Sequence, residues 1–352
     1  MPFDEDGYKD IFMSFSTPIS EPIAFEPALS ALRAAGEPTR LRLLALLAQG
    51  ELTVSDITDI VGQSQPRISR HLKLLVEADL IERRREGAWA FFGLSEHSVG
   101  AALVRAALER LDDGDPTLAR DRERLVAVRA THQKAAAEYF SANAERWDEL
   151  RGLQAAAPAL ERAILEALGD APIGAALDLG TGTGRMLELL SPRVGRAVGV
   201  DSNRDMLALA RANLAEARVQ NAQIRHGDIF APPVPADAFD LVIVHQVLHF
   251  LDDGARAVRE AARALRPGGR LLIVDFAPHE IESLREDHAH RRLGFAPETI
   301  ESWLAAAGLE HLLRRDLPPP GGDPEKLTVS LWLARDPRIV SDPLPSSNLE
   351  VA

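Results

Sequence analysis

The spacing of apolar residues between positions 27 and 94 predicts short amphipathic helices followed by a β-hairpin. Helix starts are expected at Glu37, at Thr53 with Asp56 three residues on, and at Ser64. The inward faces should consist of apolar residues at helical spacing: Leu41, Leu44, Leu47 and Ala48 in the first helix, and Ile68, Leu72, Leu75 and Val76 in the third. Two strand-like runs, 80–84 and 88–94, complete the pattern, which predicts a winged helix-turn-helix.

The pattern changes further along the chain to short apolar strands that alternate with helices. A helix at 98–111, a linker at 112–116 and a long helix from 117 to about 150 come first. Strands are then expected at 175–179, 197–200, 223–226, 241–244 and 270–275. This alternation predicts a Rossmann-like α/β domain with a parallel sheet. Two late runs, 311–315 and 327–334, predict an antiparallel hairpin at its edge.

These patterns suit two folded domains in a chain of 352 residues. We expect a winged helix-turn-helix domain at 26–111, a linker and connecting helix at 112–134, and the α/β domain at 135–335. The ends of the chain, 1–25 and 336–352, are rich in proline and serine and are expected to be disordered.

Composition removes several classes of function. Cysteine is absent, which excludes disulfides, thiolate metal sites and cysteine nucleophiles. The net charge of −13 argues against coating nucleic acid by bulk charge. Apolar runs are too short to span a bilayer, and the acidic N-terminus does not fit a signal peptide. We therefore expect a cytoplasmic protein without a membrane partner.

The segment from Gln63 to Lys73 carries glutamine, serine, arginine and lysine but no acid. Such a helix suits the DNA major groove, where glutamine and arginine bind base edges, while arginines on a wing meet the backbone or the minor groove. The expected DNA-binding residues are Gln63, Ser64, Gln65, Arg67, Ser69, Arg70, His71, Lys73, Arg83, Arg84 and Arg85. The alternative is an ordinary solvated face, or a helix-turn-helix that binds protein.

Residues 27–94 resemble the ArsR/SmtB family of winged-helix repressors. The matching stretches are Glu37–Arg42, Glu51–Ile57 and Ser64–Leu75. The resemblance implies a homodimer on double-stranded DNA with an inverted repeat, read by a helix that begins near Ser64. Arsenic-sensing members carry two cysteines where this chain has Thr53 and Ser55. Because hydroxyls do not replace thiolates on a soft metal, we expect no metal effector.

A glycine-rich loop, Gly180-Thr181-Gly182-Thr183-Gly184, follows a predicted strand and opens a helix. Glycines let a ligand approach the backbone closely, although the loop alone fits several nucleotide-binding folds. Asp201 ends the second predicted strand. A carboxylate there can accept both ribose hydroxyls, and it argues against a 2′-phosphate.

Further segments follow this loop in order: Arg225–Ile229, Phe239–His249 and Leu265–Ile273. With Tyr139-Phe140 and Trp147-Asp148 upstream, they resemble class I S-adenosylmethionine-dependent methyltransferases over about residues 135–333. The resemblance implies S-adenosylmethionine or S-adenosylhomocysteine as cofactor, without a metal. It also implies the cofactor-binding residues Asp178, Gly180, Thr181, Gly182, Gly184, Asp201, Ser202, Met206, Asp228, Ile229 and His245.

Within that resemblance, the glycines contact the methionine part and Asp178 its amino group. Asp201 holds the ribose, and Asp228 binds the adenine amino group near Met206. Structural alternatives stand beside these roles: Asp178 as a helix cap, and Met206 as plain helix core.

No methyl acceptor is readable from the sequence. An Asn/Asp-Pro-Pro-aromatic set is missing after the fourth strand, where the chain has His245-Gln246-Val247-Leu248. Candidate general bases are His245, His249, Asp275, His288 and His290. Two functions stay open, a transcription factor that senses the nucleoside and a working methyltransferase with a DNA-binding domain. The fused layout resembles regulators of methionine-cycle genes that respond to S-adenosylhomocysteine, which favours the sensor.

Overall fold

The computed structural model describes residues 23–86, 88–95, 98–112, 114–144, 157–319 and 327–339. They form two compact units. The first contains the chain up to Arg83 together with Phe92–Leu125, and the second contains Arg84–Phe91 together with the chain from Val126 onward. Among the described residues, no helix is long and apolar enough to cross a membrane.

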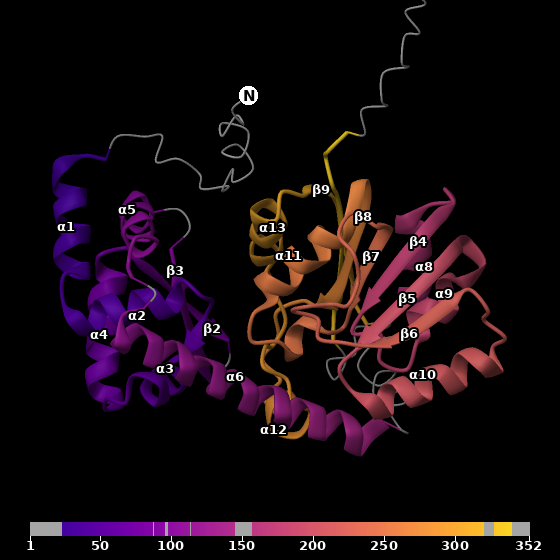
Figure 1. The fold of residues 1–352 in the computed structure, drawn as a ribbon, viewed down its shortest axis with the longest axis horizontal. Helices are drawn as coiled ribbons and strands as arrows, with labels where there is room; N and C mark the ends of the chain where they lie inside the picture. The colour runs from indigo at the N-terminus through magenta and orange to yellow at the C-terminus, as the bar shows by residue number, and fades with distance from the viewer. Residues whose placement is uncertain are drawn as a thin grey trace, which may run out of the picture. The chain divides into compact units, whose positions relative to one another are not determined.

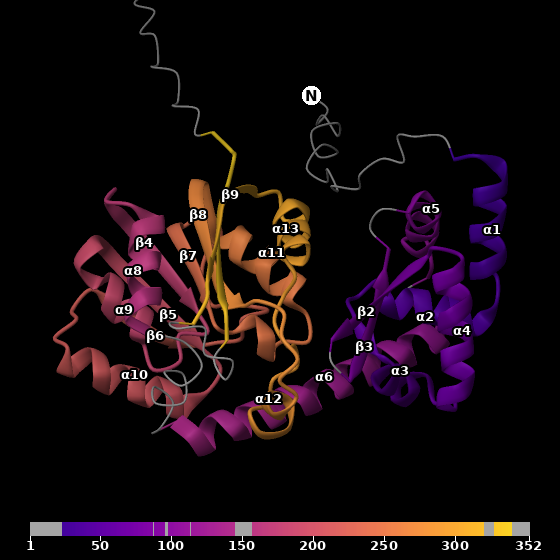
Figure 2. The same cartoon turned by 180° about the vertical axis from the view of Figure 1, so that it is seen from behind.

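The first unit has the helix-turn-helix predicted from the sequence and the base of the predicted hairpin, whose tip, Arg84–Phe91, belongs to the second unit. Its elements are α1 (Phe25–Ala35), α2 (Pro38–Leu47), β1 (Leu52–Thr53), α3 (Val54–Val61), α4 (Gln65–Glu77) and α5 (Val99–Leu108), together with the start of β2 (Ile81–Glu86) and the end of β3 (Trp89–Leu94). A small sheet has the strand order β1-β3-β2. Helices α1 and α5 pack against each other, as both views show (Figures 1 and 2).

Local capping explains where α3 begins and ends. The Thr53 hydroxyl accepts the backbone N–H of Asp56, and the Asp56 carboxylate accepts the backbone N–H of Thr53, which is a capping box. Gly62 ends the helix in the left-handed conformation, with φ of 71°. The predicted helix start at Thr53 is confirmed.

The buried faces of α2 and α4 correct two details of the predicted pattern. Ile68, Leu72 and Leu75 are buried as predicted, but Val76 is 36% exposed because it lies about 80° around the helix from Ile68. In α2 the predicted inward position of Ala48 is wrong. Ala48 follows the last helical residue and is exposed, while Leu43 and Leu46 are buried beside Leu44 and Leu47.

The second unit is a seven-stranded sheet with helices on both faces. Its helices are most of α6 (Pro116–Asn143), α8 (Ala157–Leu168), α9 (Arg185–Leu190), α10 (Arg204–Glu216), α11 (Gly254–Ala264), α12 (Ser283–Asp287) and α13 (Pro297–Ala306). Its strands are β4 (Ile173–Leu179), β5 (Val194–Asp201), β6 (Ala222–His226), β7 (Phe239–His245), β8 (Leu265–Phe276), β9 (Glu310–Leu317) and β10 (Val329–Arg335). Its described residues also include short 3₁₀ turns at Ser191–Arg193 and Leu248–Phe250.

The strand order β6-β5-β4-β7-β8-β10-β9 is that of a Rossmann-like fold. Strands β6, β5, β4, β7 and β8 are parallel, and β10 is antiparallel to both β8 and β9. The predicted antiparallel pair at the edge is thus confirmed. Helices α11 and α13 cover one face of the sheet, and α8, α9 and α10 cover the other (Figure 1).

Strand β8 begins earlier than the sequence predicted. It includes Pro267-Gly268-Gly269, which precede the predicted start of the strand at residue 270. A Cβ at Gly269 would lie 2.8 Å from the carbonyl oxygens of Arg266 and Phe239, so only glycine permits this close approach of backbones. The register with β7 shifts between Phe239 and Leu241 at the same place.

The fold also sets where a ligand can bind. Connections leave the carboxyl ends of β4 and β7 toward opposite faces of the sheet, and a crevice forms at such a switch point. The predicted glycine-rich loop follows β4, and His245 ends β7. Both therefore lie at this crevice.

Candidate ligand cavity and DNA-reading helix

A cavity of about 500 Å³ lies in the second unit at the carboxyl ends of β4, β5 and β7. This volume is typical of pockets for small molecules. Every cofactor-binding residue predicted from the sequence lines it except Gly184. Gly184 instead caps α9, and a Cβ there would lie 3.3 Å from the Ala210 Cβ of α10. Its role in the structure is helix packing beside the loop.

The glycine-rich loop is held in place by contacts that leave no room for a side chain at Gly180. Gly180 has φ of 75°, and a Cβ there would lie 2.5 Å from a methyl carbon of Val247. The N–H of Gly182 donates to Asp201 Oδ2 at 2.9 Å. Buried Asp178 accepts the Thr181 hydroxyl at 2.6 Å. The loop thus closes against the ends of β5 and β7 and presents its backbone to the cavity.

Asp201 joins the loop to the start of α10. Besides Gly182, its carboxylate accepts the backbone N–H of Asn203 at 2.8 Å. Burial raises the pKa of Asp201 above its ordinary value, and the hydrogen bonds from Asn203 and Gly182 oppose that rise. Each carboxylate oxygen retains a lone pair for a further donor. Asp201 can therefore bind a ligand hydroxyl in addition to its two backbone partners.

Helix α6 forms a wall of the cavity that the sequence did not predict. Its lining residues are Ala130, Gln133, Lys134, Ala136, Ala137 and Phe140. Asn203 ties this wall to α10, because its side-chain Nδ2 donates to the carbonyl of Ala137 at 3.1 Å and to the Ser141 hydroxyl at 3.0 Å. The same side chain caps α10 through Oδ1. An asparagine before a helix is a recognisable capping residue, but the sequence does not indicate that the Asn203 side chain also bonds to α6.

Gln246 is a further lining residue that sequence reasoning did not select. Its φ of 54° places a non-glycine residue in the left-handed region, a conformation that concentrates at functional sites. The side chain is buried, and its Nε2 has no hydrogen-bond partner in the described structure. A buried amide donor therefore lies beside His245, at the end of β7.

Most of the candidate general bases lie away from the cavity. His249 Nδ1 lies 2.7 Å from Asp275 Oδ1, and both side chains are fully buried. His290 packs against the His249 ring at 4.3 Å, and burial lowers its pKa far below the ordinary value. His288 Nδ1 lies 2.7 Å from the Tyr139 hydroxyl. Of the five candidates only His245 lines the cavity.

The exposed face of α4 carries most of the predicted DNA-reading residues. Those that are exposed are Ser64, Gln65, Arg67, Ser69, Arg70 and Lys73. Gln63 and His71 turn toward the body of the unit instead. Gln63 Nε2 donates to the Thr39 hydroxyl at 3.4 Å, and His71 Nδ1 lies 3.5 Å from a Glu37 carboxylate oxygen. The face that points to solvent is therefore basic and polar, without an acid before Glu77.

The predicted wing arginines differ in their surroundings. Arg83 and Arg85 are exposed on β2. Arg84 is partly buried, and its Nη1 lies 2.5 Å from the Thr299 hydroxyl within the second unit. On the wing, Arg83 and Arg85 thus face solvent, whereas Arg84 contacts Thr299.

Two family models match the chain in the regions where these sites lie. Residues 37–83 match the model for bacterial regulatory proteins of the arsR family, and residues 177–273 match a methyltransferase domain. A helix-turn-helix transcriptional regulator of Methanocaldococcus jannaschii is 40% identical over 76 residues, which are 21% of this chain and 85% of that protein. This chain is an ArsR-family protein with a methyltransferase domain.

Relatives of the methyltransferase domain are matched over only part of their length. The uncharacterized methyltransferase YcgJ of Bacillus subtilis is 36% identical over 105 residues, 30% of this chain and 42% of that protein. Its solved structure aligns with a TM-score of 0.42 at 22% identity, over 50% of this chain and 97% of that one. A demethylmenaquinone methyltransferase of Thermus thermophilus is 39% identical over 144 residues, 40% of this chain and 64% of that protein.

The ArsR-type unit uses Thr53 for structure where arsenic sensors use a thiolate. The Thr53 hydroxyl is buried and engaged with Asp56 in the capping box. Among the described residues, no group of three or more histidine, cysteine, aspartate or glutamate side chains is arranged to hold a metal ion.

We therefore expect arsenite and zinc to leave the DNA affinity of the purified protein unchanged, because hydroxyls do not replace thiolates on soft metals. Fluorescence anisotropy of labelled promoter DNA, with and without micromolar metal, measures this. A Thr53→Cys, Ser55→Cys double variant is the matched comparison. Release of DNA from the unsubstituted protein by metal would contradict the prediction.

Proposed function

We propose that this protein is a transcriptional regulator of the ArsR type whose methyltransferase domain binds S-adenosylmethionine or S-adenosylhomocysteine as an effector. The observation that carries the proposal is the course of α6. In the first unit, the Asp121 carboxylate pairs with Arg42 at 2.6 Å, and Arg124 donates to the carbonyl of Ile60 at 2.9 Å. The same helix then supplies the cavity wall around Ala137 and Phe140. One continuous helix thus serves both the DNA-reading unit and the ligand cavity.

The lining residues suit the proposed nucleoside. Gly180 and Gly182 line the cavity and have no side chains, so the methionine part can lie against their backbone. Asp201 accepts the ribose hydroxyls with its remaining lone pairs, and Asp228 receives the adenine amino group. The unpartnered Nε2 of Gln246 is a donor for an oxygen at the methionine end.

The first unit binds double-stranded DNA through α4 in this proposal. Arg67 and Arg70 read base edges, while Ser69 and Lys73 contact phosphates. A homodimer on an inverted repeat is supported by apolar side chains on the helix pair α1 and α5. Phe25 is 76% exposed, Leu32 53% and Val99 42%, which suits a surface that a second copy covers.

An active methyltransferase that carries a DNA-binding domain is the second candidate. The observation in its favour is His245, a possible general base that lines the cavity near the apolar rings of Phe140 and Phe250. The names of the methyltransferase relatives agree with it. The sensor remains our first proposal, because His249, Asp275, His288 and His290 do not line the cavity.

A mobility shift on the protein's own promoter, with and without each nucleoside, tests the proposal. We expect one nucleoside to change the dissociation constant for DNA about 5- to 150-fold, the usual range of coupling between sites. Titration calorimetry should show tight binding of that nucleoside. Incubation with S-adenosylmethionine and candidate acceptors should produce no S-adenosylhomocysteine. DNA binding that ignores both nucleosides would overturn the sensor and leave the enzyme as the leading reading.

A further inference from the structure

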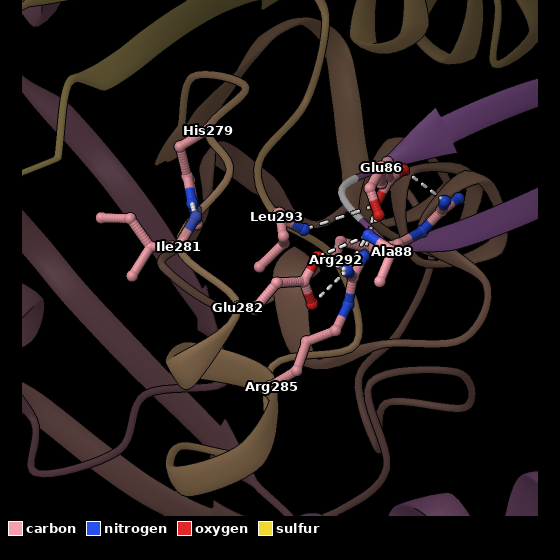
Figure 3. A network of polar contacts seen from close by, with 8 residues as sticks. All are labelled: Glu86, Ala88, His279, Ile281, Glu282, Arg285, Arg292 and Leu293. Atoms are coloured by element: carbon pink, nitrogen blue, oxygen red, sulfur yellow. Dashed lines mark hydrogen bonds and ion pairs between the residues drawn. The ribbon is translucent and has the colours of Figure 1, made fainter.

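The tip of the hairpin β2–β3 is held within the second unit by a buried cluster of charges (Figure 3). Glu86 Oε1 lies 2.6 Å from Arg292 Nη1, and Oε2 lies 3.3 Å from Arg285 Nη2. The backbone N–H of Leu293 also donates to Glu86 at 3.3 Å. The side chains of Arg285 and Arg292 are only 3% and 5% exposed. The carboxylate of Glu86 therefore pairs with two guanidinium groups that are shielded from water, and Glu282 supplies a second carboxylate to Arg285 at 3.1 Å.

Aromatic and backbone contacts reinforce this cluster. The Arg285 and Arg291 guanidinium groups lie 4.7 and 5.3 Å from the centre of the Trp89 ring, which suits cation–π attraction. Arg285 Nη1 also donates to the carbonyl of Glu86 at 2.9 Å. The N–H of Ala88 donates to Glu282 at 2.6 Å. The tip is recognised by its charge, its ring and its backbone together.

These contacts use the surface with which a wing meets DNA. Arg84, one of the three wing arginines, already contacts Thr299, and Trp89 and Glu86 are covered by the segment that follows α12. Held in this way, Arg84, Glu86 and Trp89 are engaged within the second unit and are not available to a DNA groove. Breaking the contact would remove the carboxylate that pairs with both buried arginines, so a partly formed contact is unfavourable.

We propose that Arg285, Arg291 and Arg292 form a docking site for the hairpin tip, and that docking withholds the wing from DNA. The DNA half of this proposal rests on the proposed function of the chain. The docking half rests on the contacts alone. Docked and DNA-bound states compete, and the first unit binds DNA more tightly when the tip is released.

The docking site is connected to the ligand cavity through Asp252. Its carboxylate lies 2.7 Å from Arg291 Nε and 3.0 Å from His132 Nδ1 of α6. Burial opposes ionisation, but the hydrogen bond from His132 and the charge of Arg291 hold the pKa of Asp252 below its ordinary value. Asp252 follows Phe250 and Leu251, which line the cavity.

A second connection leads from the same segment to the docking arginines. The carbonyl oxygen of His249 accepts the backbone N–H groups of Arg291 and Arg292 at 2.9 and 3.0 Å. A ligand that packs against Phe250 and Leu251 thus stabilises the segment that positions these arginines. In our proposal the ligand favours docking, and it thereby weakens DNA binding.

Hydrogen exchange of the tip tests docking without DNA or ligand. Glu86→Gln removes the charge but keeps the shape of the side chain. Glu82→Gln on the same strand is the matched control, because Glu82 is exposed and accepts a hydrogen bond from Ser95 rather than from the docking arginines. We expect amides of residues 84–91 to exchange about tenfold faster in Glu86→Gln than in the unsubstituted protein, and the control to differ less than about twofold. Trp89→Ala should act like Glu86→Gln.

The consequence for DNA is measured with a duplex from the chain's own upstream region, at one fixed salt concentration. Both glutamine variants lose one negative charge on the hairpin, so general electrostatics affects them equally. We expect Glu86→Gln to bind about tenfold more tightly than Glu82→Gln, and S-adenosylhomocysteine to have little effect on it.

The outcomes separate the two levels of the proposal. Equal exchange in Glu86→Gln and the unsubstituted protein would overturn docking, whatever the DNA result. Faster exchange in Glu86→Gln with unchanged DNA affinity would overturn the proposal that docking withholds the wing from DNA. If the unsubstituted protein does not bind the duplex at all, the proposed function fails, while the exchange experiment still decides whether the tip docks.

Discussion

Asp201→Ala should weaken binding of the nucleoside effector by about a hundredfold or more. Two hydrogen bonds from ribose hydroxyls to the carboxylate are lost, each contributing about 1.5–3 kcal/mol. The variant should still bind promoter DNA, but its affinity should no longer respond to the nucleoside, because coupling between two sites disappears when the effector does not bind. Titration calorimetry measures the first effect, and a mobility shift with and without the nucleoside measures the second.

The structure requires a stability control for this variant. Asp201 also accepts the backbone N–H groups of Gly182 and Asn203, so its loss loosens the glycine-rich loop. Thermal unfolding should show a modest decrease in stability with one cooperative transition retained. Asp205→Ala removes the same charge from the exposed first turn of α10 and should leave nucleoside binding nearly unchanged. Normal nucleoside affinity in Asp201→Ala would disprove the proposed role of this carboxylate.

Arg67→Ala combined with Arg70→Ala should abolish specific DNA binding while nucleoside binding survives. Both side chains are exposed on α4, on a face without an acid before Glu77. Each contact to a base edge contributes about 1–3 kcal/mol, so the loss of two lowers affinity more than tenfold. Anisotropy titrations with promoter and scrambled duplexes distinguish the loss of specific binding from the loss of general charge attraction.

A control for charge is available in the second unit. Arg259 and Arg263 are exposed on α11, and their replacement by alanine removes the same two positive charges away from α4. This control should retain promoter affinity within about twofold at physiological salt, because Arg259 and Arg263 lie outside the predicted reading helix and salt screens exposed surface charges. Undiminished promoter binding by the Arg67, Arg70 variant would show that α4 is not the reading helix.

Sequence patterns that depend only on neighbouring residues predicted much of the fold and many of the residues that line the cavity. The capping box at Thr53 and the glycine-rich loop after β4 are set by residues within a few positions of each other. Asp201 followed from its place at the end of a predicted strand, where parallel strands present side chains to a common edge. The candidate general bases were predicted less well. His249 and His290 are buried against Phe276 and do not line the cavity.

The sequence by itself determined the two fold types, their order, and the residues that the glycine-rich loop and the recognition helix present. These depend on capping, periodicity and strand ends, which act over short distances along the chain. Only the tertiary structure decided that α6 forms a cavity wall, that Asn203 holds it, and that Glu86 meets Arg292. Those contacts join residues that are far apart in sequence. Packing of whole elements selects such partners, and no local pattern records them.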